Sequence, residues 1–187
     1  WDDRSDDIVW RGGINGTGAF SVAPAAADNI GVVQRLRMAL KCKGTDVDFK
    51  FIYNAKQPQC KMLRKAGLIG DKVPAHDWCA KKYAIDIDGF TNAWCNFMQR
   101  LKLGCCVLKV GSQMDYTQWY YHKLVPGEHF VPIQADLSDL EEKLDWVRMN
   151  AQQARRIAQQ GQAFAKAMTF ESERDRAAEI IEEREAR

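Results

Sequence analysis

The stretch KYAIDIDGFTNAWCNFMQRLKLGCCVLKV, residues 82–110, decides the fold of this chain. It divides into a strand, KYAIDIDG, a helix, AWCNFMQRLKLG, and a second strand, CCVLKV. A strand, a helix and a strand in succession form a βαβ unit, in which the helix crosses over between two parallel strands. Four apolar residues of the helix recur at helical spacing and predict one face packed on the sheet: Trp94, Phe97, Met98 and Leu101.

The segments on either side continue this alternation of short apolar runs and helical periods. It predicts an α/β fold, a Rossmann-like parallel sheet flanked by helices. Further strands are expected over 8–10, 47–53 and 129–133, and Pro132 favours an edge position for the last of them. Helices are expected over residues 29–40, 60–66, 136–150 and 151–168, and from Gln118 onward. Asp28 or Asn29 is the expected N-cap of the first helix. Ser138 and Glu141 are spaced as a capping box at the start of the helix over 136–150.

The chain is expected to form one domain over 1–168, followed by a charged helix over 169–187. Its 187 residues, of which 46% are hydrophobic, suffice for one core. Beyond Glu171 only a narrow apolar stripe interrupts the charges, which indicates a solvated terminal helix. A coil that binds a partner is the alternative interpretation of this segment.

Composition excludes several classes of function. Lysine and arginine total 27 against 25 acidic residues, and a net charge of +2 does not indicate binding to nucleic acid. No apolar run approaches the length of a membrane span. The six cysteines lack CxxC spacing and are interpreted as free thiols in a reducing compartment, so we expect the chain in the cytoplasm. The chain begins without methionine, and further residues are expected upstream.

Polar residues stand at the ends of three predicted strands. IDIDG ends in Asp88 and Gly89, and a helix that follows such a strand directs backbone N–H groups toward an anion such as a diphosphate. Asp88 as a simple helix cap is the alternative. Asp86 and Asp88 also form a DxD pair of the kind that binds a divalent metal, but no third ligand is evident, so we expect no metal site.

Other candidate residues carry a weaker signal. The first strand ends in an arginine and two glycines, and the third in Lys109, Gly111 and Ser112, which suit phosphate oxygens. Trp119 is suited to stacking on a base or a sugar, although aromatic residues at this spacing are more often core. His129 has no partner in a triad arrangement and is more often structural than catalytic in such a context.

Several segments together resemble glycosyltransferase family 90, which includes bacterial lipopolysaccharide-modifying enzymes and Rumi-like protein O-glucosyltransferases. The resemblance covers residues 8–168 and is most specific at HFVPIQADLSDL, while IDIDGFTNAW and GCCVLKV look closest to the lipopolysaccharide branch. The resemblance implies an inverting, metal-independent transfer of a sugar from a nucleotide-diphosphate donor, such as a UDP-sugar. The implied acceptor is a hydroxyl of a glycan or lipopolysaccharide, and the implied location is the inner face of a bacterial membrane. The segments that carry it are WRGG, KYAIDIDGFTNAW, LKLGCCVLKV, QWYYHKLVPGEHFVPIQADLSDLEEKLDW and ARRIAQQGQAFA.

The resemblance further implies that this chain is the C-terminal, donor-binding half of a two-domain GT-B-type enzyme. The general base is then expected in an N-terminal half outside this sequence, and no cofactor is needed. Cys95 and Ile14 replace basic residues of Rumi-like members, so neutralisation of the diphosphate falls to Arg11, Lys109 and backbone amides. The expected donor-binding residues are Arg11, Gly12, Gly13, Asp88, Gly89, Asn92, Lys109, Ser112, Trp119 and His129.

Two functions of other classes compete with a glycosyltransferase. One is a noncatalytic nucleotide-binding or interaction module that uses the charged C-terminal helix. The other is a thiol-dependent enzyme built on Cys79 or Cys95, which is the weakest hypothesis because no activating histidine lies at a recognisable spacing.

Overall fold

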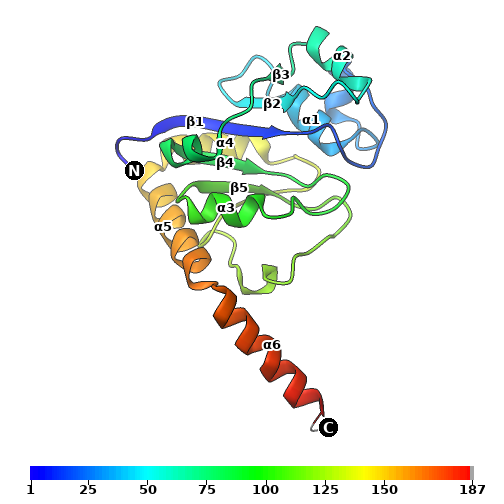
Figure 1. The fold of residues 1–187 in the computed structure, drawn as a ribbon. Coiled ribbons are helices and arrows are strands. Elements are labelled where there is room, and N and C mark those ends of the chain that lie inside the picture. Colours follow the sequence, from blue (N-terminus) through cyan, green and yellow to red (C-terminus); the bar gives the residue numbers. More distant parts are fainter. Residues whose placement is uncertain (186–187) are drawn as a thin grey trace.

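In the computed structural model, which describes residues 1–185, six parallel strands form one sheet in the order β3-β2-β1-β4-β5-β6 (Figure 1). Each strand is parallel to its neighbours, as the βαβ pattern predicts, and β6 with Pro132 lies at an edge. The predicted α/β, Rossmann-like class is therefore confirmed. The strands are β1 Ser5–Gly12, β2 Asp48–Ile52, β3 Ile69–Gly70, β4 Lys81–Asp86, β5 Cys106–Val110 and β6 Val131–Ile133.

Helices cover both faces of the sheet, because apolar side chains point alternately to either side of each strand. On one face, β-strand residues such as Ile85 and Leu108 share a core with Leu36 of α1 and Leu144 of α4. On the other face, Val107 packs with residues of α3, and α5 contacts both α3 and β5. The helices are α1 Gln34–Lys41, α2 Gln59–Lys65, α3 Asn96–Lys102, α4 Leu140–Met149, α5 Ala151–Ala167 and α6 Phe170–Glu185.

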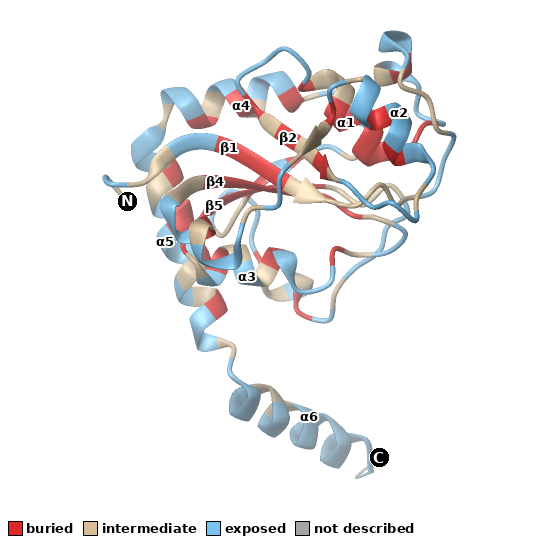
Figure 2. Ribbon diagram, turned by 45° about the horizontal axis from the view of Figure 1, so that its top comes forward, coloured by how far each residue is buried: buried red, intermediate tan, exposed pale blue. Residues whose placement is uncertain are grey.

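The last helix, α6, extends away from the sheet and has no buried residue (Figure 2). Its first turn is tied to the domain by an ion pair between Glu173 and Lys123. The predicted C-terminal helix is thus present over the described part, while residues 186 and 187 lie outside it. No helix within residues 1–185 is both long and apolar enough to cross a bilayer.

Two expectations about helix starts are wrong. The first helix begins at Gln34 with Val33 as N-cap; Asp28 instead binds Lys41, and Asn29 Oδ1 accepts a hydrogen bond from the Gly31 amide. The loop over residues 13–33 therefore replaces the turn of helix that the periodicity predicted.

The start of the fourth helix also differs from the predicted capping box. Asp139, rather than Ser138, is the N-cap of α4, and its Oδ1 accepts a hydrogen bond from the Gln134 amide. Leu137 is buried at a positive φ of 67°, so the chain turns sharply just before the helix. Tertiary burial of one leucine thus overrides the local capping pattern.

Aromatic side chains explain the remaining errors. Trp94 was assigned to the apolar face of the central helix, yet α3 begins only at Asn96 and the side chain of Trp94 is exposed at a positive φ of 42°. The helix expected from Gln118 onward is only a 3₁₀ turn, Tyr121–Lys123. In both segments the aromatic residues belong to loops at the carboxyl edge of the sheet.

Candidate functional site

The direction of the strand order reverses between β1 and β4. From β1 the chain proceeds through β2 to β3 on one side, and from β4 through β5 to β6 on the other. The loops that leave these two strands separate at this point and open a crevice at the carboxyl edge of the sheet. Ligands of doubly wound sheets bind at such a switch point.

We call this narrow opening, whose volume is about 20 Å³, the switch-point crevice. The loop after β1 doubles back so that Gly18 lies against the backbone just before α1: an added Cβ would come within 2.7 Å of the Val33 nitrogen. Gly16 and Gly18 both have positive φ, 149° and 135°, so glycine is needed at both positions. The crevice is lined by Gly16, Thr17, Val33, Gln34, Arg35, Asp88, Gly89, Ser112, Gln113, Met114 and Tyr116.

Gln34 and Arg35, at the start of α1, hold the crevice together. The Nε2 of Gln34 donates to the carbonyl oxygens of Gly111 and Ala135, at 3.0 and 2.7 Å, which ties α1 to the ends of β5 and β6. Arg35 donates from Nη1 to Gly13 O and from Nη2 to Ile87 O. One buried arginine thereby fastens the loop after β1 to the loop after β4.

The guanidinium of Arg35 is surrounded closely. It lies 5.3 Å from the centre of the Trp10 ring, and an added Cβ on Gly89 would lie 3.2 Å from its Cζ. Burial lowers the pKa of Arg35 to about 10, opposed by the attraction of Asp86 and Asp88, so the group is charged at neutral pH. Its Nε is buried without a hydrogen-bond partner among residues 1–185.

A second buried cation, Lys109, connects β5 to the carboxylates of the IDID strand. It is the cross-strand neighbour of Asp86, and its Nζ lies 3.0 Å from Asp86 Oδ2 and 3.0 Å from Asp88 Oδ1. The Asp86 contact is an ion pair without hydrogen-bond geometry, whereas Asp88 accepts a hydrogen bond. Burial disfavours the charged lysine, but the two carboxylates outweigh this effect and raise the pKa of Lys109.

Asp86, Asp88, Lys109 and Arg35 form a cluster of two negative and two positive groups. Lys109 is paired with both carboxylates and is not a free charge for a diphosphate, whereas Arg35 makes its hydrogen bonds to the carbonyl oxygens of Gly13 and Ile87. The expectation that Asp88 merely caps a helix is wrong, since the N-cap of α3 is Cys95. A loop over residues 87–95 lies between β4 and α3 and includes Asp88, so the N–H groups of that helix do not directly follow the carboxylate as predicted.

Arg11 lies on the β2 side of β1. Its Nη2 contacts Asp48 Oδ2 at 2.6 Å and its Nε donates to Asp71 O at 2.7 Å. Of the neighbouring glycines, Gly13 supplies the carbonyl bound by Arg35, and Gly12 packs beside the Trp10 ring. The donor-binding role of these three residues stays a prediction. Arg35, and not Arg11, is among the residues that line the crevice.

His129 lies before β6, and hence at the opposite, amino edge of the sheet. Its Nδ1 accepts a hydrogen bond from the Val125 amide, and its ring packs at 5.1 Å from the Phe164 ring of α5. These contacts fit the structural interpretation of this histidine. Its predicted contact with a donor stays untested, and the structure does not bring it together with Asp88, Gly89 or Ser112.

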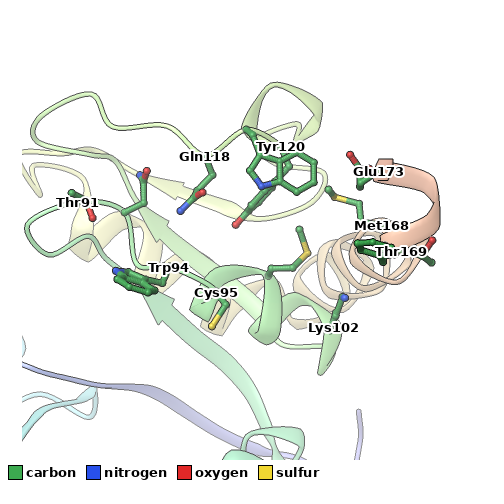
Figure 3. Close-up of a pocket in the computed structure, with 13 residues that line it drawn as sticks. Thr91, Trp94, Cys95, Lys102, Gln118, Tyr120, Met168, Thr169 and Glu173 are labelled. Carbon is green, nitrogen blue, oxygen red and sulfur yellow. The ribbon is translucent and has the colours of Figure 1, made fainter. Parts of the chain in front are cut away.

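Beside the crevice lies a second hollow of about 680 Å³, which we call the aromatic groove (Figure 3). Asn92 connects the two hollows: it lines the groove, and its Nδ2 donates to Asp88 Oδ2 at 3.3 Å and to Tyr116 O at 3.0 Å. The groove is lined by Thr91, Asn92, Trp94, Cys95, Met98, Lys102, Gln118, Trp119, Tyr120, Met168, Thr169, Phe170 and Glu173.

Sequence reasoning missed Gln34, Arg35 and Trp94. A signal existed for the arginine, because the segment QRLRMAL carries two arginines in an otherwise apolar helix, and both are buried. The cysteines give no support to a thiol enzyme: the thiol of Cys79 binds the His76 carbonyl oxygen rather than an imidazole, and Cys95 lines the groove.

A parallel sheet covered by helices on both faces, with its strand order reversing between β1 and β4, places the chain in the class of doubly wound α/β proteins. Comparison with known proteins is more specific. Residues 33–181 match the model of glycosyl transferase family 90, and the chain belongs to this family. The matched region begins after Arg11 and includes the switch-point residues of α1, β4 and β5.

Relatives with assigned names are protein O-glucosyltransferases. Protein O-glucosyltransferase 3 of Homo sapiens is 37% identical over 117 residues, 62% of this chain and 21% of that protein. Protein O-glucosyltransferase 1 of Rattus norvegicus is 32% identical over 88 residues, 47% of this chain and 22% of its own length. Uncharacterized protein 179R of Invertebrate iridescent virus 6 is 29% identical, covering 88% of this chain and 15% of that protein. The chain thus spans about a fifth or less of these relatives.

Proposed function

We propose that this chain supplies the nucleotide-sugar donor site of a glycosyltransferase. The observation that carries the proposal is the convergence of the loops after β1, β4 and β5 on one crevice at the switch point. Glycine-rich backbone at this place allows N–H groups to approach phosphate oxygens closely. A nucleotide diphosphate, for example that of a UDP-sugar, is a ligand of this chemistry.

Charge beside the crevice is arranged for orientation rather than for bulk attraction. Asp86 and Asp88 hold Lys109, and the carbonyl oxygens of Gly13 and Ile87 hold Arg35, so both cations keep a set position while the sugar–phosphate bond breaks. Fixed donors stabilise the negative charge that develops on the leaving diphosphate. The hydroxyl of Ser112 is the side-chain donor we assign to this task, beside the backbone N–H groups of the glycine-rich loops.

We further propose that transfer is inverting and independent of a metal ion. The DxD carboxylates, which in other proteins ligate divalent cations, are here within 3.0 Å of an ammonium group. In this proposal the general base and the rest of the active site come from an N-terminal domain that precedes these residues. The acceptor is a glycan of the lipopolysaccharide type on the cytoplasmic face of a membrane, with a protein hydroxyl as the alternative suggested by the relatives' names.

Calorimetric titration tests the donor role. We expect UDP or another nucleotide diphosphate, or its sugar conjugate, to bind this chain without metal, and added magnesium to leave the affinity unchanged. Arg35→Lys removes the fork that joins the two loops, so the affinity is expected to fall about tenfold, the effect of losing one charge-assisted hydrogen-bond pair.

The matched control is Arg174→Lys, the same exchange on the exposed helix α6. It is expected to leave the affinity unchanged. If no nucleotide binds the chain, or if both variants bind as the parent does, the donor role is refuted. In that case a noncatalytic module that acts through α6 becomes the better explanation.

A further inference from the structure

Two tryptophan side chains of the aromatic groove are exposed to solvent, and the backbone of one of them has an unfavourable conformation. Trp94 is 83% exposed and Trp119 is 58% exposed. Trp94 also has a φ of 42°, in the left-handed region that bulky residues rarely adopt. Strained positions of this kind persist where the surrounding structure imposes them, and they cluster at ligand sites. Neither burial nor backbone preference explains why an indole is held at this place.

Polar side chains are interspersed with these aromatic rings. The amides of Asn92 and Gln118 provide both donors and acceptors, and Lys102 and Glu173 provide one charge of each sign. Figure 3 shows Gln118 and Trp94 on different sides of the hollow, with Glu173 and Thr169 at the end formed by the junction of α5 and α6. The lining of the groove therefore combines aromatic, uncharged polar and charged side chains along its length.

This mixture matches the surface of a sugar ring. A hexose has one or two faces of C–H groups that stack on an indole, and a rim of hydroxyls that exchange hydrogen bonds with amides and carboxylates. An apolar peptide, by contrast, would leave these amides unpaired. The volume of about 680 Å³ lies in the range of small-molecule sites.

We propose that the aromatic groove binds a hexose unit of a carbohydrate acceptor, with Trp94 and Trp119 as stacking platforms. The assignment as acceptor rests on the donor role proposed for the switch-point crevice. Asn92 lines the groove and donates hydrogen bonds to Asp88 and to the Tyr116 carbonyl oxygen, and both of these residues line the crevice, so a sugar in the groove lies next to the proposed site of the leaving diphosphate. Acceptor and donor would then approach each other across this one side chain.

Titration followed by NMR tests the proposal on the full chain. Each of the six tryptophans contributes one indole N–H signal, and substitution of Trp94 and Trp119 by phenylalanine assigns the two in the groove. The probes are lactose, maltotriose and a core oligosaccharide released from lipopolysaccharide. We expect at least one of them to shift the signals of Trp94 and Trp119, whereas those of the buried Trp10 and Trp78 stay in place.

Variants distinguish stacking from a general effect on the fold. Trp94→Ala and Trp119→Ala are expected to weaken saccharide binding about tenfold, as for an aromatic anchor of a binding site. Phe90→Ala is the matched control, because Phe90 is an exposed aromatic residue on the same loop as Trp94 but does not line the groove. It is expected to bind saccharides as the parent does. Unchanged thermal denaturation shows that each variant is folded.

The outcomes separate this inference from the donor role. If nucleotides bind but none of the three saccharides shifts either indole, the groove is not a carbohydrate site and the inference is refuted. If saccharides bind in the groove but no nucleotide binds, the carbohydrate site is supported and its assignment as acceptor site is refuted. Equal weakening by Phe90→Ala would also contradict stacking in the groove.

Discussion

Replacement of Lys109 by methionine is expected to destabilise the chain strongly, because it leaves two buried carboxylates without their cation. Asp86 and Asp88 are only 3% and 4% exposed and both lie 3.0 Å from the ammonium. Removal of one member of a buried ion pair costs about 3–5 kcal/mol. A chain of this length unfolds with a free energy on the order of 10 kcal/mol, so the variant remains folded and measurable.

The pH dependence of the stabilisation by Lys109 follows from its pKa, which the two carboxylates raise in the folded state. The folded state holds the lysine proton more tightly than the unfolded state does. The stabilisation is therefore complete below the ordinary lysine pKa of 10.5 and is lost as the pH rises through the raised pKa.

Urea unfolding followed by tryptophan fluorescence, at about pH 7.5, measures the loss. Lys143→Met is the matched control, since Lys143 also faces two acidic residues, but at the surface of α4. Its loss is expected to stay below about 1 kcal/mol. A loss for Lys109→Met no larger than that of the control would refute the account of the cluster.

Two further predictions concern packing and thiol chemistry. Replacement of a glycine by alanine within a helix normally stabilises it. At Gly161, however, the new Cβ would lie 2.5 Å from His129 O and 2.8 Å from Leu101 Cδ2, so we expect Gly161→Ala to lower the free energy of unfolding in urea by about 1–3 kcal/mol. An equal or higher free energy of unfolding would contradict this close packing. Burial raises the pKa of Cys42 to about 12 and that of Cys105 to about 11. At neutral pH we therefore expect a thiol reagent to modify two cysteines rapidly and the other four only after denaturation. Rapid modification of a third cysteine would contradict the packing. The two exposed residues are Cys79 and Cys95, and the four buried ones are Cys42, Cys60, Cys105 and Cys106.

Periodicity alone located most of the fold. The βαβ unit over residues 82–110 and the long helix α5 have apolar repeats that only one kind of element satisfies, so their type was predictable. Around Trp94 and Trp119, where aromatic residues dominate, the same spacing is compatible with a helix that packs on the core and with an exposed loop. The sequence pattern does not distinguish the two structures, because the burial of an aromatic side chain depends on which distant segment of the chain packs against it.

The sequence by itself determined a parallel α/β sheet, the family to which its motifs belong, and the strand ends that carry Asp88, Gly89, Lys109 and Ser112. Only the tertiary structure decided which of these meet. It turned Arg11 toward Asp48, placed His129 at the far edge, and brought Arg35 from α1 into the crevice. The physical reason is that strand order and loop path set distances between residues far apart in the chain, and those distances decide whether a charged group faces a ligand or a partner of opposite charge.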